Sequence, residues 1–527
     1  MNKKLLKNIL GRLPYTVELY WELVQRHKPW AAHYNLDGLA AVLPEAVEQT
    51  KAFAASAEPG KKIFLFAPLH YWIEFSTLLG LALAGKGHDV TLSFLPYANW
   101  DKPIQKFDLR RQNLYTRDVL SVVRPLMQVQ PLLDVRPFSR ELPKNLQKAV
   151  EAVSVFDTQY TLQVEDITRE EEVYKIRQER NLEAAWNARA WLYAHRPDLV
   201  IVPNGTILEM GVIYQVAKNL NIPVVTFEFG DQRERIWIAQ DAEIMRHETD
   251  ALWKALGEEP LSEDALAKLQ DLFSARQDAK IWQNFARQWQ DTPTEGGAAV
   301  RQKLGLDDRP VVLLATNVLG DSLTLGRQTF SESMAEWIER TVKFFAERED
   351  VQLVIRVHPG EMLTHGTSMM DVVRDALGEI PPQIHLVRPD EKVNTYDITD
   401  ITDLGLVYTT TVGLEMALRG IPVVVAGQTH YRNRGFTQDP ASWEAYFETL
   451  NTLLADLEST RLTQEQVELA WRYAYLFFFA FPKPFPWHLL DLKTDIKERP
   501  LAFVLGVEGT KRYGETFAFL TGKPLTW

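Results

Sequence analysis

Short apolar runs alternate with amphipathic stretches along the chain, in two series. The first series predicts buried strands at 63–68, 89–95, 199–203 and 222–227, and helices at 72–84 and 209–219. The second predicts strands at 311–316, 353–357, 384–387, 404–408 and 421–427, and a helix at 331–348. Strands that alternate with helices in this way are typical of parallel sheets with helices on both faces. The pattern therefore predicts an α/β protein.

A polar stretch separates the two series. Residues 291–297 read DTPTEGG, and small, Pro- and Gly-containing segments are typical of linkers. We expect a Rossmann-like domain with helical insertions over residues 1–295 and a second such domain over 296–480. The aromatic and Pro-rich C-terminal segment, 481–527, is expected to form a strap that packs back across the domains.

The strand at 353–357 ends in a His-Pro-Gly sequence. In open α/β sheets, ligands bind outside the carboxyl ends of the strands. Pro359 lacks a backbone N–H and keeps the preceding residue extended, so His358 is held at that end. An imidazole N–H there can meet a bound anion, and Arg356 adds positive charge. The alternative is that His358 simply ends a strand.

Three consecutive threonines follow the strand at 404–408. Thr409, Thr410 and Thr411 precede a short helical stretch, and Thr410 or Thr411 is a natural N-cap. Free N–H groups at a helix N-terminus, together with hydroxyls, suit a phosphate, and Gly413 lets a ligand approach the backbone. Glu415, one turn further on, is placed to reach a ribose. Plain capping is the alternative.

Composition narrows the classes of function. The 527 residues are 46% hydrophobic and 24% charged, with a net charge of -12, so a globular protein is expected and bulk nucleic-acid binding is not. There is no cysteine, which excludes disulfides and cysteine nucleophiles and fits a cytoplasmic protein. No apolar run approaches the ~20 residues that a membrane-spanning helix needs.

The region 353–437 resembles the capsule polysaccharide biosynthesis family, which includes bacterial Kdo transferases. More loosely, it resembles bacterial sialyltransferases and teichoic-acid glycerophosphotransferases. The resemblance rests on His358-Pro359 and on the threonine turn followed by Glu415. It implies a GT-B-like fold: two Rossmann-like doubly wound parallel-sheet domains facing a cleft. It also implies that these residues hold the phosphate and ribose of a nucleotide-linked donor, with Arg434 of the 428–437 loop beside them.

Residues 228–233, EFGDQR, resemble the Glu-Asp-Gly-x-x-Arg signature of the family's acceptor-side domain. Glu228 and Arg233 match that signature. Phe229 stands where the retaining Kdo transferases carry an Asp, the candidate nucleophile of a double displacement. Retaining chemistry is therefore not carried over, and Glu228 or Asp231 is the candidate base on an acceptor hydroxyl. Structural pairing of Glu228 with Arg233 is the alternative.

Two further strand ends belong to the acceptor side. His70 follows the first strand and Asn204 follows the strand at 199–203, so both are candidates for acceptor binding. A structural role for His70 is the alternative. The acids at 397, 400 and 403 do not have EF-hand spacing and are interpreted as solvated loop residues. No metal site is expected.

The sequence thus predicts a glycosyltransferase that moves a sugar from a nucleotide-activated donor to a capsule-type polysaccharide or a lipid-linked glycan. It needs no cofactor beyond the donor, and a CMP-linked sugar is among the candidates. A glycerophosphotransferase, a nucleotide-sugar 2-epimerase and a non-catalytic scaffold subunit remain alternatives, the last because of Phe229. A cytoplasmic location is expected. The basic, leucine-bearing stretch 1–12 predicts either a helix packed on the domain or peripheral attachment to the inner membrane surface.

Overall fold

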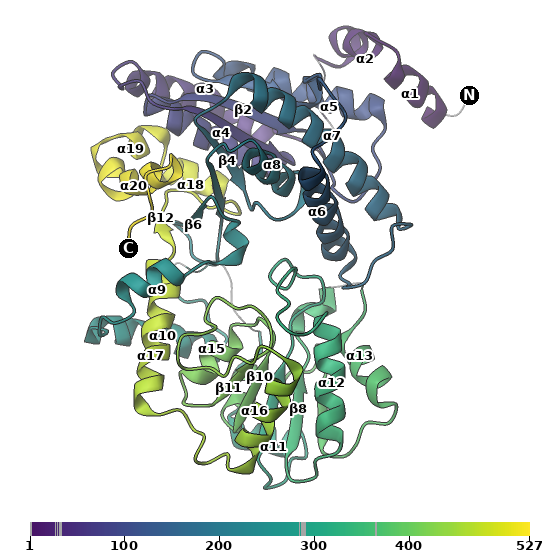
Figure 1. The fold of residues 1–527 in the computed structure, drawn as a ribbon. Helices are drawn as coiled ribbons and strands as arrows, with labels where there is room; N and C mark the ends of the chain where they lie inside the picture. The colour runs from purple at the N-terminus through teal and green to yellow at the C-terminus, as the bar shows by residue number, and fades with distance from the viewer. Residues whose placement is uncertain are drawn as a thin grey trace. The chain divides into compact units, whose positions relative to one another are not determined.

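The computed structural model describes residues 3–26, 28, 30, 34–283, 285, 291–363 and 366–527. The chain forms two compact units (Figure 1). The first comprises Met1–Asp157, Thr168–Met245 and Pro482–Thr526; the second comprises Thr158–Ile167, Arg246–Phe481 and Trp527. Each unit contains one sheet, so the two predicted strand series form two separate sheets.

The first unit contains a seven-stranded sheet of order β12-β6-β5-β4-β1-β2-β3. Its strands are β1 Lys62–Pro68, β2 Asp89–Leu95, β3 Gln128–Pro131, β4 Leu199–Pro203, β5 Val224–Glu228, β6 Arg235–Gln240 and β12 Lys483–Pro484. The five strands from β3 to β5 are parallel, in Rossmann-like order. β6 and β12 extend the sheet antiparallel at one edge.

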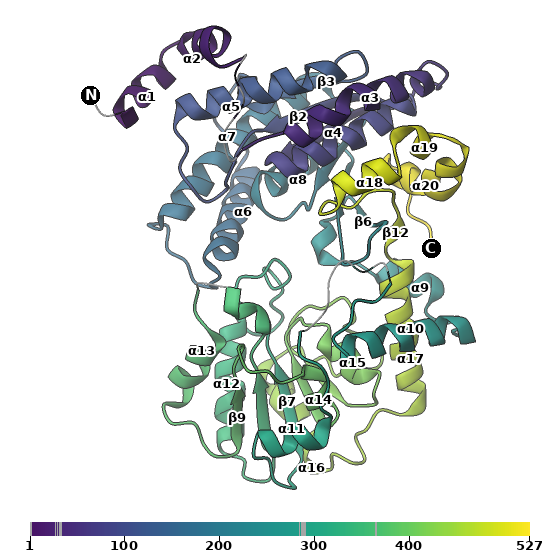
Figure 2. The same cartoon turned by 180° about the vertical axis from the view of Figure 1, so that it is seen from behind.

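Helices cover both faces of this sheet. The crossovers from β1 to β2 and from β4 to β5 run in opposite directions across it, which places their helices, α4 and α8, on opposite faces. α4 packs beside α3 and α19 (Figure 2), whereas α8 packs on α7. The helices are α1 Lys3–Arg12, α2 Thr16–Tyr20, α3 Asp37–Ala54, α4 His70–Gly85, α5 Lys106–Val119, α6 Lys144–Leu162, α7 Glu172–His195, α8 Leu208–Asn219, α18 Leu492–Glu498, α19 Leu501–Leu505 and α20 Val507–Leu520.

The second unit contains a five-stranded sheet of order β11-β10-β7-β8-β9, parallel throughout. Its strands are β7 Val311–Ala315, β8 Gln352–Arg356, β9 Ile384–Val387, β10 Leu404–Val407 and β11 Val423–Val425. Numbered from β7, the order is again Rossmann-like. All five strands were expected from their short apolar runs, because strands buried on both faces lack polar alternation.

The helices of the second unit enclose a core that contains Trp337 and Tyr446, both fully buried. The Trp337 indole N–H donates to the Tyr446 hydroxyl at 3.0 Å. Glu165, from the 158–167 segment, accepts the first N–H groups of α12. The helices are α9 Asp250–Leu256, α10 Glu263–Gln277, α11 Gly297–Lys303, α12 Met334–Ala346, α13 Met369–Leu377, α14 Thr395–Thr399, α15 Val412–Ala417, α16 Trp443–Ala455 and α17 Gln464–Tyr475.

The compact units divide the chain at other places than the expected 1–295, 296–480 and 481–527. α9 and α10 belong to the second unit, because α10 packs on α17 and its Arg276 pairs with Glu415. Residues 482–526 belong to the first unit, because β12 pairs with β6 and α19 packs on α3. Residues 235–240, for which no strand was predicted, form the strand β6.

Among the described residues, none of the helices combines the length and the apolar character that crossing a membrane requires.

Candidate functional site

The second sheet has its topological switch point between β7 and β10, which are neighbours whose chains leave in opposite directions. Ligands of such sheets bind outside the strand ends at this point. Thr316 and Asn317 follow β7, and Thr409 follows Tyr408 at the end of β10. The Asn317 Oδ1 accepts the Thr409 N–H at 3.1 Å, which ties the two strand ends together.

His358 is fixed at the neighbouring strand end. Its backbone N–H donates to the Thr316 Oγ1 at 3.0 Å, and its Nδ1 accepts the Gly360 N–H at 3.0 Å. A neutral ring whose Nδ1 accepts carries its proton on Nε2, which is the tautomer that can donate outward. The side chain is exposed. These two contacts hold His358 at the end of β8.

The threonine turn is held by backbone contacts. The Thr410 carbonyl accepts the Tyr431 hydroxyl at 2.6 Å, and the Thr410 Oγ1 accepts the Val412 N–H at 3.4 Å. Thr411 is the residue before α15, and its side chain makes no cap bond. Of the two threonines predicted as N-caps, Thr410 thus makes the weak capping contact. All three threonines are partly exposed at the strand end.

Two residues expected to contact the donor have other partners here. A Cβ on Gly413 would lie 2.4 Å from the Tyr431 hydroxyl, so the protein itself, not a ligand, occupies the space beside this glycine. Glu415 is buried and accepts from the Arg276 Nη1 at 2.6 Å. A carboxylate that is buried and paired with an arginine has a structural role. The surroundings of Glu415 therefore do not match the ribose contact that was predicted from the sequence.

The two arginines assigned to the donor are also engaged within the unit. Arg356 is buried and donates to the Arg388 carbonyl at 2.7 Å, and burial lowers its pKa. Arg434 pairs with Asp250 and donates to the Thr249 hydroxyl at 3.2 Å. Their charge is therefore partly neutralised or buried within the protein, and His358 and the threonine turn are the groups presented at the strand ends.

In the first sheet, Asn204 and Glu228 come together at the ends of β4 and β5. The Asn204 Nδ2 donates to the Glu228 Oε2 at 3.1 Å, and the Phe229 N–H donates to the Oε1 at 3.0 Å. Burial raises the pKa of Glu228 to about 7, although both hydrogen bonds oppose the rise. A partly exposed carboxyl with such a pKa is suited to general acid–base work.

A buried ionic network supports the loop that carries Asn204. Arg177 is fully buried and pairs with Asp157 at 3.0 Å and with Glu209 at 2.9 Å. Asp157 also accepts the backbone N–H of Leu208, which has a positive φ of 56°. Such backbone strain persists only where the surroundings impose it. This network was not predicted from the sequence, in which its only local signal is one charged residue on each of three helical segments.

The other acceptor-side candidates are more dispersed. His70 begins α4 and lies against the rings of Tyr34 and Tyr71; burial, and secondarily Lys493, lower its pKa. Arg233 pairs with Asp491 at 3.1 Å and not with Glu228, so the structural pair considered as the alternative does not form. Asp231 follows Gly230 in the turn after β5 and is partly exposed.

Phe229 belongs to an aromatic cluster in the first unit. Its ring lies 4.9 Å from that of Phe75 and 5.1 Å from that of His488, and it stacks near Trp72. The His488 Nε2 also contacts the Gly230 carbonyl at 3.0 Å. Phe229 is therefore packed against aromatic neighbours while it stays partly exposed.

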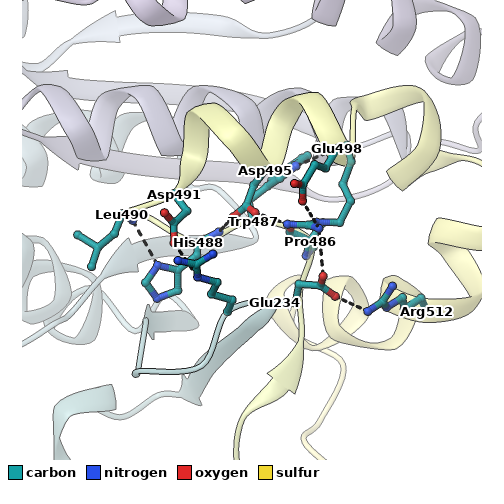
Figure 3. A network of polar contacts seen from close by, with 11 residues as sticks. Glu234, Pro486, Trp487, His488, Leu490, Asp491, Asp495, Glu498 and Arg512 are labelled. Carbon is teal, nitrogen blue, oxygen red and sulfur yellow. Dashed lines mark hydrogen bonds and ion pairs between the residues drawn. The ribbon is translucent and has the colours of Figure 1, made fainter. Parts of the chain in front are cut away.

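The turn between β5 and β6 is clamped by the C-terminal segment (Figure 3). Arg499 donates to Glu234 at 3.0 Å and to the Pro486 carbonyl at 2.6 Å, and it also pairs with Asp495. Arg512 reaches the other oxygen of Glu234. The turn that follows Glu228 is therefore anchored by residues some 260 positions later in the chain.

The three acids at 397, 400 and 403 each have a protein partner, and only Asp397 is buried, which corrects its interpretation as a solvated residue. Asp397 is buried and accepts the Glu295 N–H at 2.7 Å, Asp400 pairs with Arg419, and Asp403 accepts the Val311 N–H at 2.9 Å. Among the described residues, no group of three or more histidines and acids is placed to hold a metal ion.

The fold and the strand-end residues define an α/β protein with two Rossmann-like domains, the second of which presents polar groups at its switch point. Residues 268–454, about a third of the chain, match the model of the capsule polysaccharide biosynthesis protein family. The matched part of the chain, which contains His358 and the threonine turn, is similar to that family.

Solved structures with similarity include KpsC of Thermosulfurimonas dismutans, a β-Kdo 2,4-transferase, at 14% identity over 59% of this chain and 87% of that one, with a TM-score of 0.36. A β-Kdo 2,7-transferase of the same organism shows 13% identity over 59% and 88%, with a TM-score of 0.33. The UDP-GlcNAc 2-epimerase of Neisseria meningitidis shows 14% over 78% and 95%, with a TM-score of 0.25. Among curated proteins, none matches.

Proposed function

We propose that the protein is a glycosyltransferase that moves a sugar from a nucleotide-activated donor to a capsule-type polysaccharide or a lipid-linked glycan. The observation that carries the proposal is the family match over 268–454, because it includes the strand ends at which His358 and the threonine turn lie. Activity is argued from these groups and not from the fold, since many unrelated functions share Rossmann-like domains.

In this proposal, the second unit binds the donor. The Nε2–H of His358 and the hydroxyls of the threonine turn donate to the phosphate of the nucleotide. As the sugar leaves, negative charge grows on that phosphate, so donors fixed in advance stabilise the transition state more than the ground state. The contacts of His358 with Thr316 and Gly360 supply this fixed geometry.

In the first unit, Glu228 serves as the base that accepts a proton from the acceptor hydroxyl. Its pKa of about 7 lets it hold a proton in one step and release it in another near neutral pH. Asn204 orients the carboxylate through the 3.1 Å hydrogen bond, and Asp231 is the alternative base. With Phe229 packed in an aromatic cluster, no covalent intermediate is proposed at that position.

The first experiment is a thermal-shift screen of nucleotides and nucleotide sugars, CMP-, UDP- and CDP-linked. A ligand at a hundredfold its Kd should stabilise the protein by about 2.7 kcal/mol. Donor hydrolysis without acceptor is then followed by mass spectrometry, which separates an enzyme from a scaffold. Chelator treatment belongs in the same assay, because metal-independent transfer is part of the proposal.

Variants assign the roles. Glu228→Gln should reduce turnover about 10²–10⁴-fold and leave the nucleotide-induced shift intact, since a general base acts on transfer and not on donor binding. Asp231→Asn tests the alternative base in the same turn: if Asp231 and not Glu228 accepts the proton, this variant loses turnover and Glu228→Gln keeps it. The proposal fails if no nucleotide shifts the melting temperature and no donor is consumed.

A further inference from the structure

The first 26 residues leave an unusual number of large apolar side chains exposed. Seventeen such side chains are exposed in the described part of the chain, and seven of them lie between Leu6 and Val24. Scattered exposed leucines are ordinary, but a contiguous cluster on one segment marks an interaction surface.

Helix α1 attaches to the first unit by one face only. A Cβ on Gly11 would lie 2.4 Å from the Phe107 N, and the Lys7 Nζ lies 3.0 Å from Asp108, so this face packs on the start of α5. Leu6, Ile9 and Leu13 follow at helical spacing on another face and are 37–47% exposed. The helix is neither packed throughout on its domain nor polar on its outer side.

The following segment, α2 with the π-helical turn Trp21–Gln25, repeats this arrangement. Val17 and Trp21 are buried, whereas Leu19 and Leu23 are 58% and 80% exposed. Residues 17 and 21 lie on the opposite side of a helix from 19 and 23. The segment therefore has an inner apolar face that anchors it and an outer apolar face that the described protein leaves uncovered.

The charge of this arm differs from that of the rest of the chain. Residues 1–28 contain six Lys and Arg and two Glu, a net charge of +4 in a chain whose net charge is -12. The two acids are paired, Glu18 with Arg110 and Glu22 with Arg26. An exposed apolar stripe with basic residues beside it suits the surface of an anionic bilayer better than it suits an acidic protein surface. Tyr15, which is exposed at the turn, is a residue type enriched at membrane interfaces.

We propose that residues 6–24 form a membrane-binding arm that inserts Leu6, Ile9, Leu13, Leu19 and Leu23 into the interface of an anionic bilayer. The arm lies in the plane of the membrane and does not cross it. Acidic lipid headgroups meet Arg12 within the arm and the basic residues of 1–28 that flank it. This docking is independent of sugar transfer, which the strand ends of the two sheets would carry out.

Vesicle binding of the full chain tests the proposal. The protein should co-sediment with vesicles of phosphatidylglycerol and phosphatidylcholine but weakly with phosphatidylcholine alone, and added salt should weaken binding. Leu19→Glu with Leu23→Glu should reduce binding to the anionic vesicles roughly tenfold or more, since two exposed apolar groups are lost. Val507→Glu, at an equally exposed apolar residue of α20, is the matched control and should bind like the parent.

A label provides a second measurement that does not depend on a disruptive substitution. The chain has no cysteine, so Leu23→Cys creates a single site for an environment-sensitive fluorophore. Its emission should shift to the blue with anionic vesicles, whereas a label at Val507→Cys should not respond.

Equal vesicle binding of the double variant and the parent would overturn the proposal. So would a dimer, measured by light scattering, that the double variant dissociates, because a second copy would then cover the stripe. If the double variant still shows the normal nucleotide-induced thermal shift, its donor binding is intact, and the change in vesicle binding is a separate effect.

Discussion

At the scale of single residues, His358 is the group on which the proposed donor site depends most. Its side chain is exposed, so His358→Ala should cost less than about 1 kcal/mol of unfolding free energy. Removing a preorganised donor to developing charge should reduce kcat about 10²–10³-fold. Thr411→Val should reduce kcat less, because backbone N–H groups remain. His385→Ala, in β9 of the same sheet, is the control. A folded His358→Ala protein with near-normal kcat would refute its role.

Glu228 predicts a pH dependence of stability. Its pKa in the folded protein is about 7, above the ordinary 4.5, because of burial. Between these values the folded state holds a proton that the unfolded state has lost, so the contribution of Glu228 to stability falls as pH rises from about 4.5 to about 7. The shift corresponds to about 3 kcal/mol, and we expect roughly 1–2 kcal/mol because the side chain is partly exposed.

The Glu228→Gln variant makes this dependence measurable. An amide keeps one of the two hydrogen bonds and loses the other, so the variant should be about 1 kcal/mol less stable than the parent at pH 5. At pH 8 the parent bears the cost of a buried carboxylate, so the difference should vanish or reverse. Chemical unfolding at both values tests this. A difference that stays constant with pH would mean that the pKa of Glu228 is not raised.

At the scale of elements, α15 is positioned by the contact between Gly413 and Tyr431. A methyl group at 413 would come within 2.4 Å of the buried Tyr431 hydroxyl, so Gly413→Ala should destabilise the protein by about 1–3 kcal/mol. Gly514→Ala, in helix α20, where the nearest atom is the Cγ2 of Thr510 in the same helix at 3.3 Å, should be neutral or stabilising. Tyr431→Phe in the same chain should partly relieve the clash. Additive losses in the double variant would contradict this packing.

The central strands of the two sheets could be predicted more fully than the strands at the edge of the first sheet. The second sheet consists of short buried runs, and each was evident as an apolar sequence bounded by turns. β6 was missed although Ile236 and Ile238 are buried between partly exposed neighbours, which is the alternation of an antiparallel strand. β12 has two residues, Lys483 and Pro484, and no pattern at all. Its place depends on a partner about 245 positions away.

The site could be predicted only as far as local sequence determines it. Pro359 and the strand end place His358, and the sequence shows both. The partners of Glu415 and Arg434 could not be inferred, because Arg276 and Asp250 lie 139 and 184 positions away. Asn317 was visible as the first residue of a loop, but only the order of β7 and β10 in the sheet reveals its contact with Thr409. The partners of side chains that are far apart in the sequence are determined by the topology of the fold.

At the scale of the whole molecule, the first unit needs its last segment. A chain that ends at Phe481 lacks β12 and Arg499, so β6 becomes an open edge strand and the turn after Glu228 loses its anchor. We expect this truncated protein to aggregate and to be cleaved readily within the first unit, since open edges promote association. Limited proteolysis with mass spectrometry would locate the cuts. Restored protection on adding residues 482–527 as a separate peptide is the control; resistance without the peptide would refute the prediction.

The pairing of β12 with β6 also bears on the order in which the protein is completed on the ribosome. β6 emerges nearly 250 residues before its partner, which at ordinary rates of synthesis is a delay on the order of 10–50 s. Apart from Thr158–Ile167 and Trp527, the whole second unit is translated within that interval. The first unit is therefore completed only when residues 482–526 follow the second unit, and the edge of β6 stays unpaired for nearly half of the chain's synthesis. Chaperone demand should accordingly fall on the first unit.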